Sequence, residues 1–156
     1  MTAVLSLGSN LGDRAAHLAA AREMLAAQFP IVGSSSVYET APVGVTDQPA
    51  FLNQVVVLDD EDAEGLLAAA HRVEEARGRI RSRRWGPRTL DVDVIAVDAL
   101  SSVSPHLTLP HPRAHERAFV LVPWLEVDRA AELPGHGSVE ALVRRVDVSV
   151  VRRWAS

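Results

Sequence analysis

The stretch that decides the fold reads Arg84-Trp85-Gly86-Pro87-Arg88-Thr89-Leu90-Asp91-Val92-Asp93-Val94-Ile95-Ala96-Val97. It places an arginine-containing turn directly before an apolar strand that carries two aspartates at alternate positions. Side chains at i and i+2 of a strand project from the same face, so we expect Asp91 and Asp93 to aim both carboxylates at one spot. Leu90, Val92 and Val94 then fill the opposite face. Folding alone does not require two acids there, since adjacent buried carboxylates repel unless a cation lies between them.

Magnesium suits this pair of acids. Mg²⁺ prefers one or two carboxylates together with water and phosphate oxygens from a substrate. Nearby guanidinium groups bind the remaining phosphate charge through paired hydrogen bonds. The stretch therefore predicts metal-assisted phosphate chemistry. A solvated edge strand with a chance Asp-x-Asp is the alternative, because a motif needs structural context to confirm it.

The arginines near this strand form a local basic cluster. They lie at Arg77, Arg79, Arg81, Arg83, Arg84 and Arg88, whereas the whole chain has a formal net charge of −4 and a pI near 5.8. A nucleic-acid-binding domain usually spreads basic charge over a face and has a high pI, so the compact cluster suits a small polyanion instead. Arg77 and Arg83 also fit ordinary solvated surface positions.

The composition indicates one soluble domain. The chain has 156 residues with 47% hydrophobic content, enough for a substantial core. It has no cysteine, which excludes disulfides and thiolate chemistry. The amino terminus does not resemble an export signal, and no apolar segment approaches the ~18 residues that span a bilayer. We expect a cytoplasmic protein that binds neither membrane nor nucleic acid.

The order of expected elements indicates the fold class. Strands are expected at 3–7, 34–38, 51–58 and 90–97, with one helix after Asp13 that buries Leu18, Ala21, Leu25 and Phe29 and another after residue 62 that buries Leu66, Ala70 and Val73. The segment 40–49 is too long for a tight hairpin turn. This βαββαβ order is typical of a ferredoxin-like α+β sandwich, in which two helices pack on one face of an antiparallel sheet. The last third adds a C-terminal extension of shorter elements, including a helix that starts near Ser138.

Four blocks of the sequence together resemble one enzyme family. They are Leu7-Gly8-Ser9-Asn10-Leu11-Gly12-Asp13-Arg14, Asp47-Gln48-Pro49-Ala50-Phe51-Leu52-Asn53, Arg84-Trp85-Gly86-Pro87-Arg88-Thr89-Leu90-Asp91-Val92-Asp93 and Leu109-Pro110-His111-Pro112-Arg113. In this order, over about the first 125 residues, the chain resembles the 6-hydroxymethyl-7,8-dihydropterin pyrophosphokinase family of folate biosynthesis. The resemblance implies a single pyrophosphokinase domain over residues 1–156. It also implies transfer of the β,γ-pyrophosphoryl group of ATP to the pterin hydroxymethyl group, with release of AMP.

The resemblance implies a role for each candidate residue. The metal ligands would be Asp91 and Asp93, shared by two Mg²⁺ ions, and the catalytic arginines would be Arg79 and Arg88. The ATP contacts would be Glu74, His111 and Thr108, and more loosely His71 and Arg81. The pterin contacts would be Thr40 and Val43 through their backbone, Asn53 through its amide and Phe119 through its ring. An amide can match the donors and acceptors along a pterin edge, while a ring covers its face.

Several of these residues have an ordinary structural alternative. Glu74 follows the apolar stripe of its helix, where a surface glutamate is common. Phe119 begins an apolar run that fits a core, and Tyr38 suits either a second ring over the pterin or core packing. His111 and His115 have the spacing of a metal pair on a helix, but the prolines on both sides of His111 disfavour a regular helix there. His111 suits a phosphate or ribose contact better.

Arg113 and Arg117 either extend the anion-binding surface or are simply exposed to solvent.

One departure from the family and two other function classes also bear on the assignment. Val45 follows Gly44, at a position where many relatives have an aromatic residue. We therefore expect no ring from the tip of the 40–49 loop to stack on the pterin. A nucleotidyltransferase would keep a Gly-Ser pair within a dozen or so residues of its Asp-x-Asp motif, whereas about eighty separate them here. An RNA-binding module would need exposed aromatics on central strands, and aromatic content is only 4%.

Overall fold

The computed structural model describes residues 2–41, 49–78 and 89–155. Its strands are β1 (Ala3–Ser9), β2 (Ile31–Ser34), β3 (Tyr38–Thr40), β4 (Phe51–Leu58), β5 (Asp91–Val97), β6 (Ser102–Ser104), β7 (Leu107–Leu109), β8 (Glu132–Leu133), β9 (Gly137–Ser138) and β10 (Val151–Arg153). Its α-helices are α1 (Arg14–Ala26), α2 (Ala63–Ala76), α3 (Ala118–Val127) and α4 (Val139–Val143). Two 3₁₀ turns, η1 (Ala114–Glu116) and η2 (Val148–Val150), complete the described elements.

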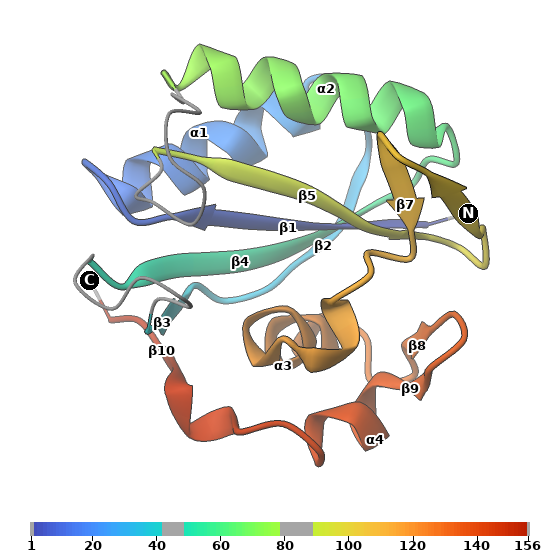
Figure 1. Cartoon of the computed structure of the whole chain (residues 1–156). Helices are drawn as coiled ribbons and strands as arrows, with labels where there is room; N and C mark the ends of the chain where they lie inside the picture. The colour runs from blue at the N-terminus through green and yellow to red at the C-terminus, as the bar shows by residue number, and fades with distance from the viewer. Residues whose placement is uncertain (1, 42–48, 79–88, 156) are drawn as a thin grey trace.

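An antiparallel sheet forms the middle layer of the molecule. Its strands run in the order β10-β3-β4-β1-β5, and β2 also pairs with β4. Helices α1 and α2 cover one face, and α3 and α4 lie on the other side (Figure 1). The mixed α/β class with an antiparallel sheet is thus confirmed.

The two long helices form where the sequence pattern predicted them. Asp13 caps α1 by accepting a hydrogen bond from the backbone N–H of Ala16 at 3.1 Å. Asp62 caps α2 in the same way from Gly65 at 3.1 Å. Such caps satisfy backbone donors that the first turn leaves free. The predicted buried residues are confirmed for Leu18, Ala21 and Leu25 in α1 and for Leu66, Ala70 and Val73 in α2. The prediction for Phe29 is wrong in part, because α1 ends at Ala26 and Phe29 packs against the core from beyond the helix, only partly buried.

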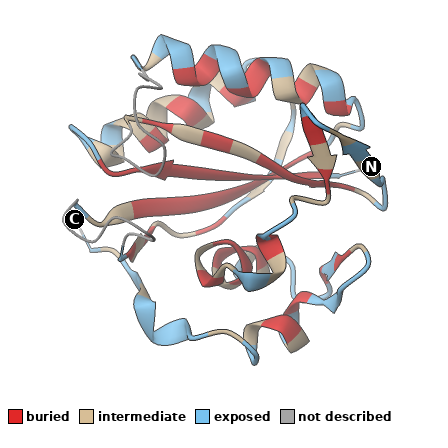
Figure 2. Cartoon of the chain, viewed as in Figure 1, coloured by how far each residue is buried: buried red, intermediate tan, exposed pale blue. Residues whose placement is uncertain are grey.

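The sheet separates two hydrophobic cores. Alternate residues of β1 point to opposite faces, so Leu5 and Leu7 pack beneath α1 and α2 while Val4 packs toward α3. The central strands β1 and β4 are buried along nearly their whole length (Figure 2). Residues that would form a half-exposed sheet in a two-layer sandwich are therefore covered on both faces.

The second predicted strand, 34–38, is wrong in its bounds. The chain forms two short strands, β2 and β3, which both pair with β4. Between these two strands the regular pairing with β4 is interrupted. Ser35 interrupts the ladder, because its hydroxyl oxygen accepts the backbone N–H of Val55 at 2.9 Å in place of a backbone carbonyl. Its hydroxyl in turn donates to the carbonyl of Ser36 at 2.7 Å.

The last third contributes more than the short extension that we expected. Helix α3 covers the second face of the sheet and buries Val120, Leu121 and Trp124. The helix predicted near Ser138 is confirmed as α4, whose first turn is capped when the Ser138 hydroxyl accepts from the N–H of Ala141 at 3.1 Å. No helix in the described part of the chain is both long and apolar enough to cross a membrane.

Candidate active site

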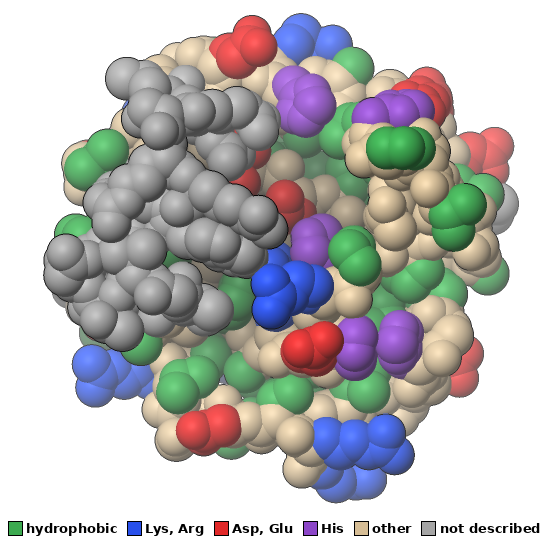
Figure 3. All heavy atoms as spheres, viewed as in Figure 1, with side chains coloured by type: hydrophobic (Ala, Val, Ile, Leu, Met, Phe, Trp, Pro, Cys, Tyr) green, Lys and Arg blue, Asp and Glu red, His purple; other side chains and the backbone are tan. Residues whose placement is uncertain are grey.

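A pocket of about 440 Å³ opens at one end of the sheet, on the side of α3. Its described lining residues are Ser6, Gly8, Thr40, Ala41, Phe51, Asn53, Asp91, Asp93, Arg113, Glu116, Arg117, Ala118, Phe119, Val146, Asp147 and Val150. Acidic, basic and histidine side chains gather around the hollow in the middle of the face in Figure 3. The pocket thus joins residues that the sequence analysis assigned separately to a metal and to a pterin.

Cross-strand register brings these residues together. Gly8 of β1 pairs with Asn53 of β4 on one side and with Asp91 of β5 on the other. Two residue pairs further along the same ladder, and on the same face, Ser6 lies opposite Asp93. A Cβ atom at Gly8 would lie 3.2 Å from the Asn53 amide nitrogen, which is tighter than most real contacts of this kind. Glycine therefore allows the amide to lie close over the centre of the sheet.

The two aspartates have the predicted arrangement. Asp91 and Asp93 both line the pocket and are half-buried, while Leu90, Val92 and Val94 are buried on the side of α1 and α2. The same-face prediction is therefore confirmed. Strand β5 lies at the edge of the described sheet. The edge position of the alternative interpretation was right, yet the aspartates face a pocket rather than open solvent.

This pair of carboxylates fits a magnesium ion that a substrate helps to bind. No group of three metal-binding side chains occurs among the described residues, so they offer no complete protein cage. Mg²⁺ does not need one, because it commonly binds through one or two carboxylates plus phosphate oxygens. The small neighbours Ser6 and Gly8 leave room in front of the acids. Asp91 and Asp93 are therefore the residues that could hold the metal.

Thr40 and Asn53 offer polar atoms that lack partners in the described structure. The Thr40 hydroxyl and the Asn53 carbonyl oxygen are buried and make no hydrogen bond there. Both residues are nearly fully buried and both line the pocket. Buried polar groups are normally satisfied, and an unsatisfied one costs about 1–3 kcal/mol. A polar ligand that enters the pocket would supply the missing partners.

Two phenylalanines line the same pocket. Phe119 belongs to the first turn of α3, and the guanidinium of Arg117 lies 5.4 Å from the centre of its ring. This cation–π contact directs both residues to the pocket, so Phe119 is a pocket residue and not solely a core residue. Phe51, at the start of β4, was not singled out from the sequence. Its position beside Asn53 in the same block was the available signal.

His111 lies next to β5, the strand that carries Asp91 and Asp93. Its backbone N–H donates to the carbonyl of Ile95 at 2.8 Å, which ties the residue to β5. Burial lowers the pKa of His111 from 6.5 to about 4, assisted by the charge of Arg117 and Arg113 and opposed by Asp91. The imidazole is therefore neutral at pH 7. His115, the other member of the suggested metal pair, instead stacks on His136 with ring centres 4.1 Å apart.

Glu74 is not a surface glutamate. Its side chain is 2% exposed, and its carboxylate accepts the backbone N–H of Val92 at 2.8 Å. Val92 separates the two aspartates in the sequence. Helix α2 therefore holds the strand that carries the two candidate metal ligands. Helical periodicity could not reveal this contact, because the partner of Glu74 is a distant backbone group.

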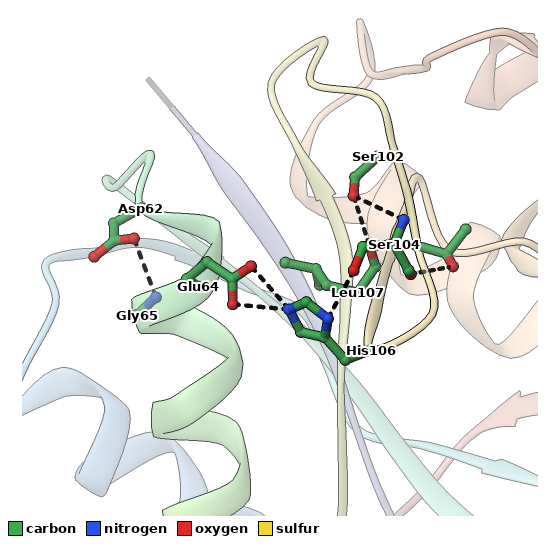
Figure 4. Close-up of polar contacts among 8 residues, drawn as sticks. Asp62, Glu64, Gly65, Ser102, Ser104, His106 and Leu107 are labelled. Atoms are coloured by element: carbon green, nitrogen blue, oxygen red, sulfur yellow. Dashed lines mark hydrogen bonds and ion pairs between the residues drawn. The ribbon is translucent and has the colours of Figure 1, made fainter.

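The hairpin β6–β7 places Thr108 outside the described lining of the pocket. The hydroxyl of Thr108 donates to the carbonyl of Ser104 at 3.2 Å. Figure 4 shows the hairpin tied to α2, where the His106 ring meets Glu64 at 2.9 Å and Ser104 at 2.6 Å. His71 is exposed on α2. Neither of these two ATP candidates reaches the described pocket.

Other candidates have different positions. Val43, Arg79, Arg81 and Arg88 lie outside the described residues, as does Val45. Tyr38 is buried and its hydroxyl donates to Glu126 at 2.6 Å, which favours core packing over a pterin contact. Arg77 donates from Nε to His17 Nδ1 at 3.0 Å, so it is not a simple solvated side chain.

The far end of the chain contributes a wall that the sequence did not predict. Val146, Asp147 and Val150 line the pocket, and β10 pairs with β3 next to Thr40. No local signal marked them, because their role depends on the chain returning to the sheet. Arg113 and Arg117 both line the pocket, which favours the anion-surface interpretation over plain solvation.

Comparison with known proteins shows the family of this chain. A family model described as 7,8-dihydro-6-hydroxymethylpterin-pyrophosphokinase matches residues 4–129. The chain belongs to this family. A relative from Methylorubrum extorquens, named 2-amino-4-hydroxy-6-hydroxymethyldihydropteridine pyrophosphokinase, is 46% identical over 154 residues and covers 97% of each chain. A relative of the same name from Mycobacterium tuberculosis is 45% identical over 152 residues, with 90% of this chain and 80% of the relative covered.

Solved structures share the fold. A Plasmodium falciparum HPPK-DHPS variant crystallised with pterin and p-hydroxybenzoate superposes with a TM-score of 0.74 at 13% identity. The match covers 97% of this chain and 47% of the Plasmodium chain. This pyrophosphokinase-family chain thus spans under half the length of those proteins, and the likeness concerns the fold.

Proposed function

We propose that this protein transfers the pyrophosphoryl group of ATP to 6-hydroxymethyl-7,8-dihydropterin and releases AMP, a step of folate biosynthesis. One observation carries the proposal. In a chain of the pyrophosphokinase family, a single pocket joins two same-face aspartates to the unsatisfied polar atoms of Asn53 and Thr40. A site for charged phosphates thus lies within reach of a site for a flat polar ring.

The phosphate half contains Asp91 and Asp93. These carboxylates would hold the two Mg²⁺ ions, which when bound neutralise phosphate charge and polarise the phosphorus that is attacked. Arg79 and Arg88 would contact the transferred and terminal phosphates, with Arg81 as a further ATP contact. Fork-shaped guanidinium groups suit this role better than a flexible ammonium group.

The remaining ATP contacts would come from α2 and from the segment after β5. His111 is neutral, so without adding charge it can donate to a phosphate oxygen, or it can donate to or accept from a ribose hydroxyl. Glu74, Thr108 and His71 are proposed as further ATP contacts on the strength of the family resemblance. Glu74 also has the structural task of holding Val92.

The pterin half lies against β3, β4 and α3. Asn53 would bind the edge of the pterin through its amide. Thr40 would contact the same ring through its backbone and its unsatisfied hydroxyl, and Val43 would do so through its backbone. Phe119 and Phe51 would cover the faces of the ring. With the pterin held in this way, its hydroxymethyl group would point toward the two aspartates.

The proposed reaction is an in-line displacement. The hydroxymethyl oxygen of the pterin forms a bond to the β-phosphorus, and the bond from that phosphorus to the α,β-bridging oxygen breaks. AMP leaves with the bridging oxygen, and the alcohol proton passes to water. No dedicated general base is needed, since a loose transition state depends mainly on positioning and charge.

We further propose that residues 1–156 form one pyrophosphokinase domain of ferredoxin-like topology. The order β3-β4-β1-β5, with a helix after β1 and another after β4, supports this description.

The test is a product assay. Purified protein with ATP, Mg²⁺ and 6-hydroxymethyl-7,8-dihydropterin should form AMP and the dihydropterin diphosphate in equal amounts, and neither product should form without the dihydropterin. A nucleotidyltransferase would instead release pyrophosphate, and an RNA-binding module would consume no ATP. Absence of pterin-dependent AMP under these conditions would overturn the proposal.

A further inference from the structure

In the block at residues 7–14, only Gly8 has a place in the function proposed above. Gly8 lines the pocket, but none of residues 9–14 is among its described lining residues. Side chains from this block instead contact the two ends of the connection between β3 and β4. That connection begins and ends beside residues of the pterin half.

Three hydrogen bonds join the block to these ends. Arg14 donates from Nη1 to the carbonyl of Ala50 at 2.9 Å and to the carboxylate of Glu39 at 3.0 Å. Asn10, which is 1% exposed, donates from its amide to the carbonyl of Pro49 at 3.1 Å. Arg14 thus links β3 to Ala50, the residue just before β4, and Asn10 holds the preceding residue, Pro49.

The contacted residues immediately precede pocket residues. Glu39 pairs across the sheet with Leu52, which packs in the core beneath α1. The next pair, Thr40 and Phe51, must face the opposite side, where both line the pocket. Arg14 therefore acts from the helix side on strand ends whose next residues face the ligand.

Arg14 is well placed to be rigid. It is the first residue of α1, directly after the capping residue Asp13. Its side chain and that of Glu39 are only 25% and 26% exposed, so solvent screens this pair less than a fully exposed one. Arg152 also approaches Glu39, at 3.8 Å, and links the same point to β10.

We infer that Arg14 is a positioning residue for the pterin half of the site, a role that rests on the function proposed above. By holding Glu39 and Ala50 it keeps the last pair of the β3–β4 ladder, Thr40 and Phe51, in place against the pocket, and so controls pterin affinity without acting on the phosphate half. Asn10 supports it through Pro49.

The test compares two arginines of the same helix. Arg14→Met removes the link to the pocket strands. Arg22→Met is the matched control, because Arg22 also bonds β4 from α1, through Gln54 at 3.1 Å, but does not touch the β3–β4 ends. Titration calorimetry measures pterin binding to protein saturated with Mg²⁺ and a non-hydrolysable ATP analogue, and separately measures binding of the analogue.

We expect Arg14→Met to weaken pterin binding at least fivefold and to leave the analogue within twofold. Arg22→Met should leave both affinities within twofold. In steady-state assays the KM for pterin should rise, while kcat should stay within about threefold of the wild-type value. This pattern is expected when a variant loses binding that is equally strong in the ground state and the transition state. Arg14→Lys, which can still donate to one acceptor, should restore part of the pterin affinity.

Several results would overturn the inference while wild-type turnover still supports the proposed function. A pterin affinity changed less than fivefold by Arg14→Met is one of them. An equal loss in Arg22→Met, or an equal loss of analogue binding, would indicate general destabilisation instead. If Arg14→Met does not fold, Glu39→Gln decides the matter, because it weakens the same link; a pterin affinity changed less than twofold would then refute the role.

Discussion

Replacement of Glu74 should destabilise the protein even in the absence of nucleotide. The buried carboxylate accepts the N–H of Val92 at 2.8 Å, at the strand that carries Asp91 and Asp93. Glu74→Leu removes this acceptor at similar side-chain volume and leaves a buried donor without its partner. Glu74→Gln keeps a neutral oxygen that can still accept.

The size of the effect follows from the geometry of this bond. A hydrogen bond to a charged group contributes about 1.5–3 kcal/mol, and an unsatisfied buried donor costs a similar amount. We therefore expect Glu74→Leu to lose about 2–3 kcal/mol of unfolding free energy. For a chain of this size that corresponds to a fall in Tm of roughly 4–12 °C, at about 2–4 °C for each kcal/mol. Glu74→Gln should lose about 1 kcal/mol.

Thermal unfolding of the apo proteins followed by circular dichroism measures these shifts. Glu75→Gln is the matched control, because Glu75 is the exposed neighbour on the same helix and should change Tm very little. Calorimetric titration with the ATP analogue then separates anchoring from a direct nucleotide contact. A Tm for apo Glu74→Leu within 1 °C of wild type would refute the anchoring role, whatever happens to ATP affinity.

Three further predictions concern the site and its support. Asp91→Asn and Asp93→Asn should each lower AMP formation at saturating Mg²⁺ at least 100-fold without loss of the folded state, as checked by circular dichroism; near-normal turnover in both would exclude them as metal ligands. Asn53→Ala should weaken pterin binding about tenfold or more, the equivalent of about 1.4 kcal/mol, with analogue binding unchanged in calorimetry. Burial raises the pKa of Glu126, but hydrogen bonds from Tyr38 and Ser36 and the charge of Arg153 outweigh it, so the pKa is lowered. The stability from Glu126 is therefore present above its unfolded pKa and lost as pH falls through the folded value, and Glu126→Gln should reduce unfolding free energy at pH 7 more than at pH 3; an equal loss at both pH values would contradict this.

Local pattern was enough for much of the architecture. The strand 51–58 has the bounds that its composition and flanking turns predicted, and α2 buries its predicted stripe. The same-face placement of Asp91 and Asp93 also follows from strand periodicity alone. In these segments, local preference and tertiary contacts agree.

Where the sequence prediction failed, the structure depends on distant partners. Helix α3 is apolar on nearly all sides and contains Pro123, so it has no helical stripe to recognise. Its place on the second face is visible only once the sheet exists. The burial of Glu74 likewise depends on the backbone of Val92, and the break between β2 and β3 depends on a hydroxyl of Ser35 that bonds Val55.

The pocket is assembled from nearly the whole length of the chain, since its described lining runs from Ser6 to Val150. Its floor needs β1 to pair with β4 and β5, and its wall needs the chain to return after α4. Contacts between such distant segments form slowly, because long loops must close first. A chain still emerging from the ribosome therefore has no complete pocket until Val150 has been made. Substrate can then bind only chains in which both ends of this lining have folded together, and by mass action it stabilises those chains against unfolding.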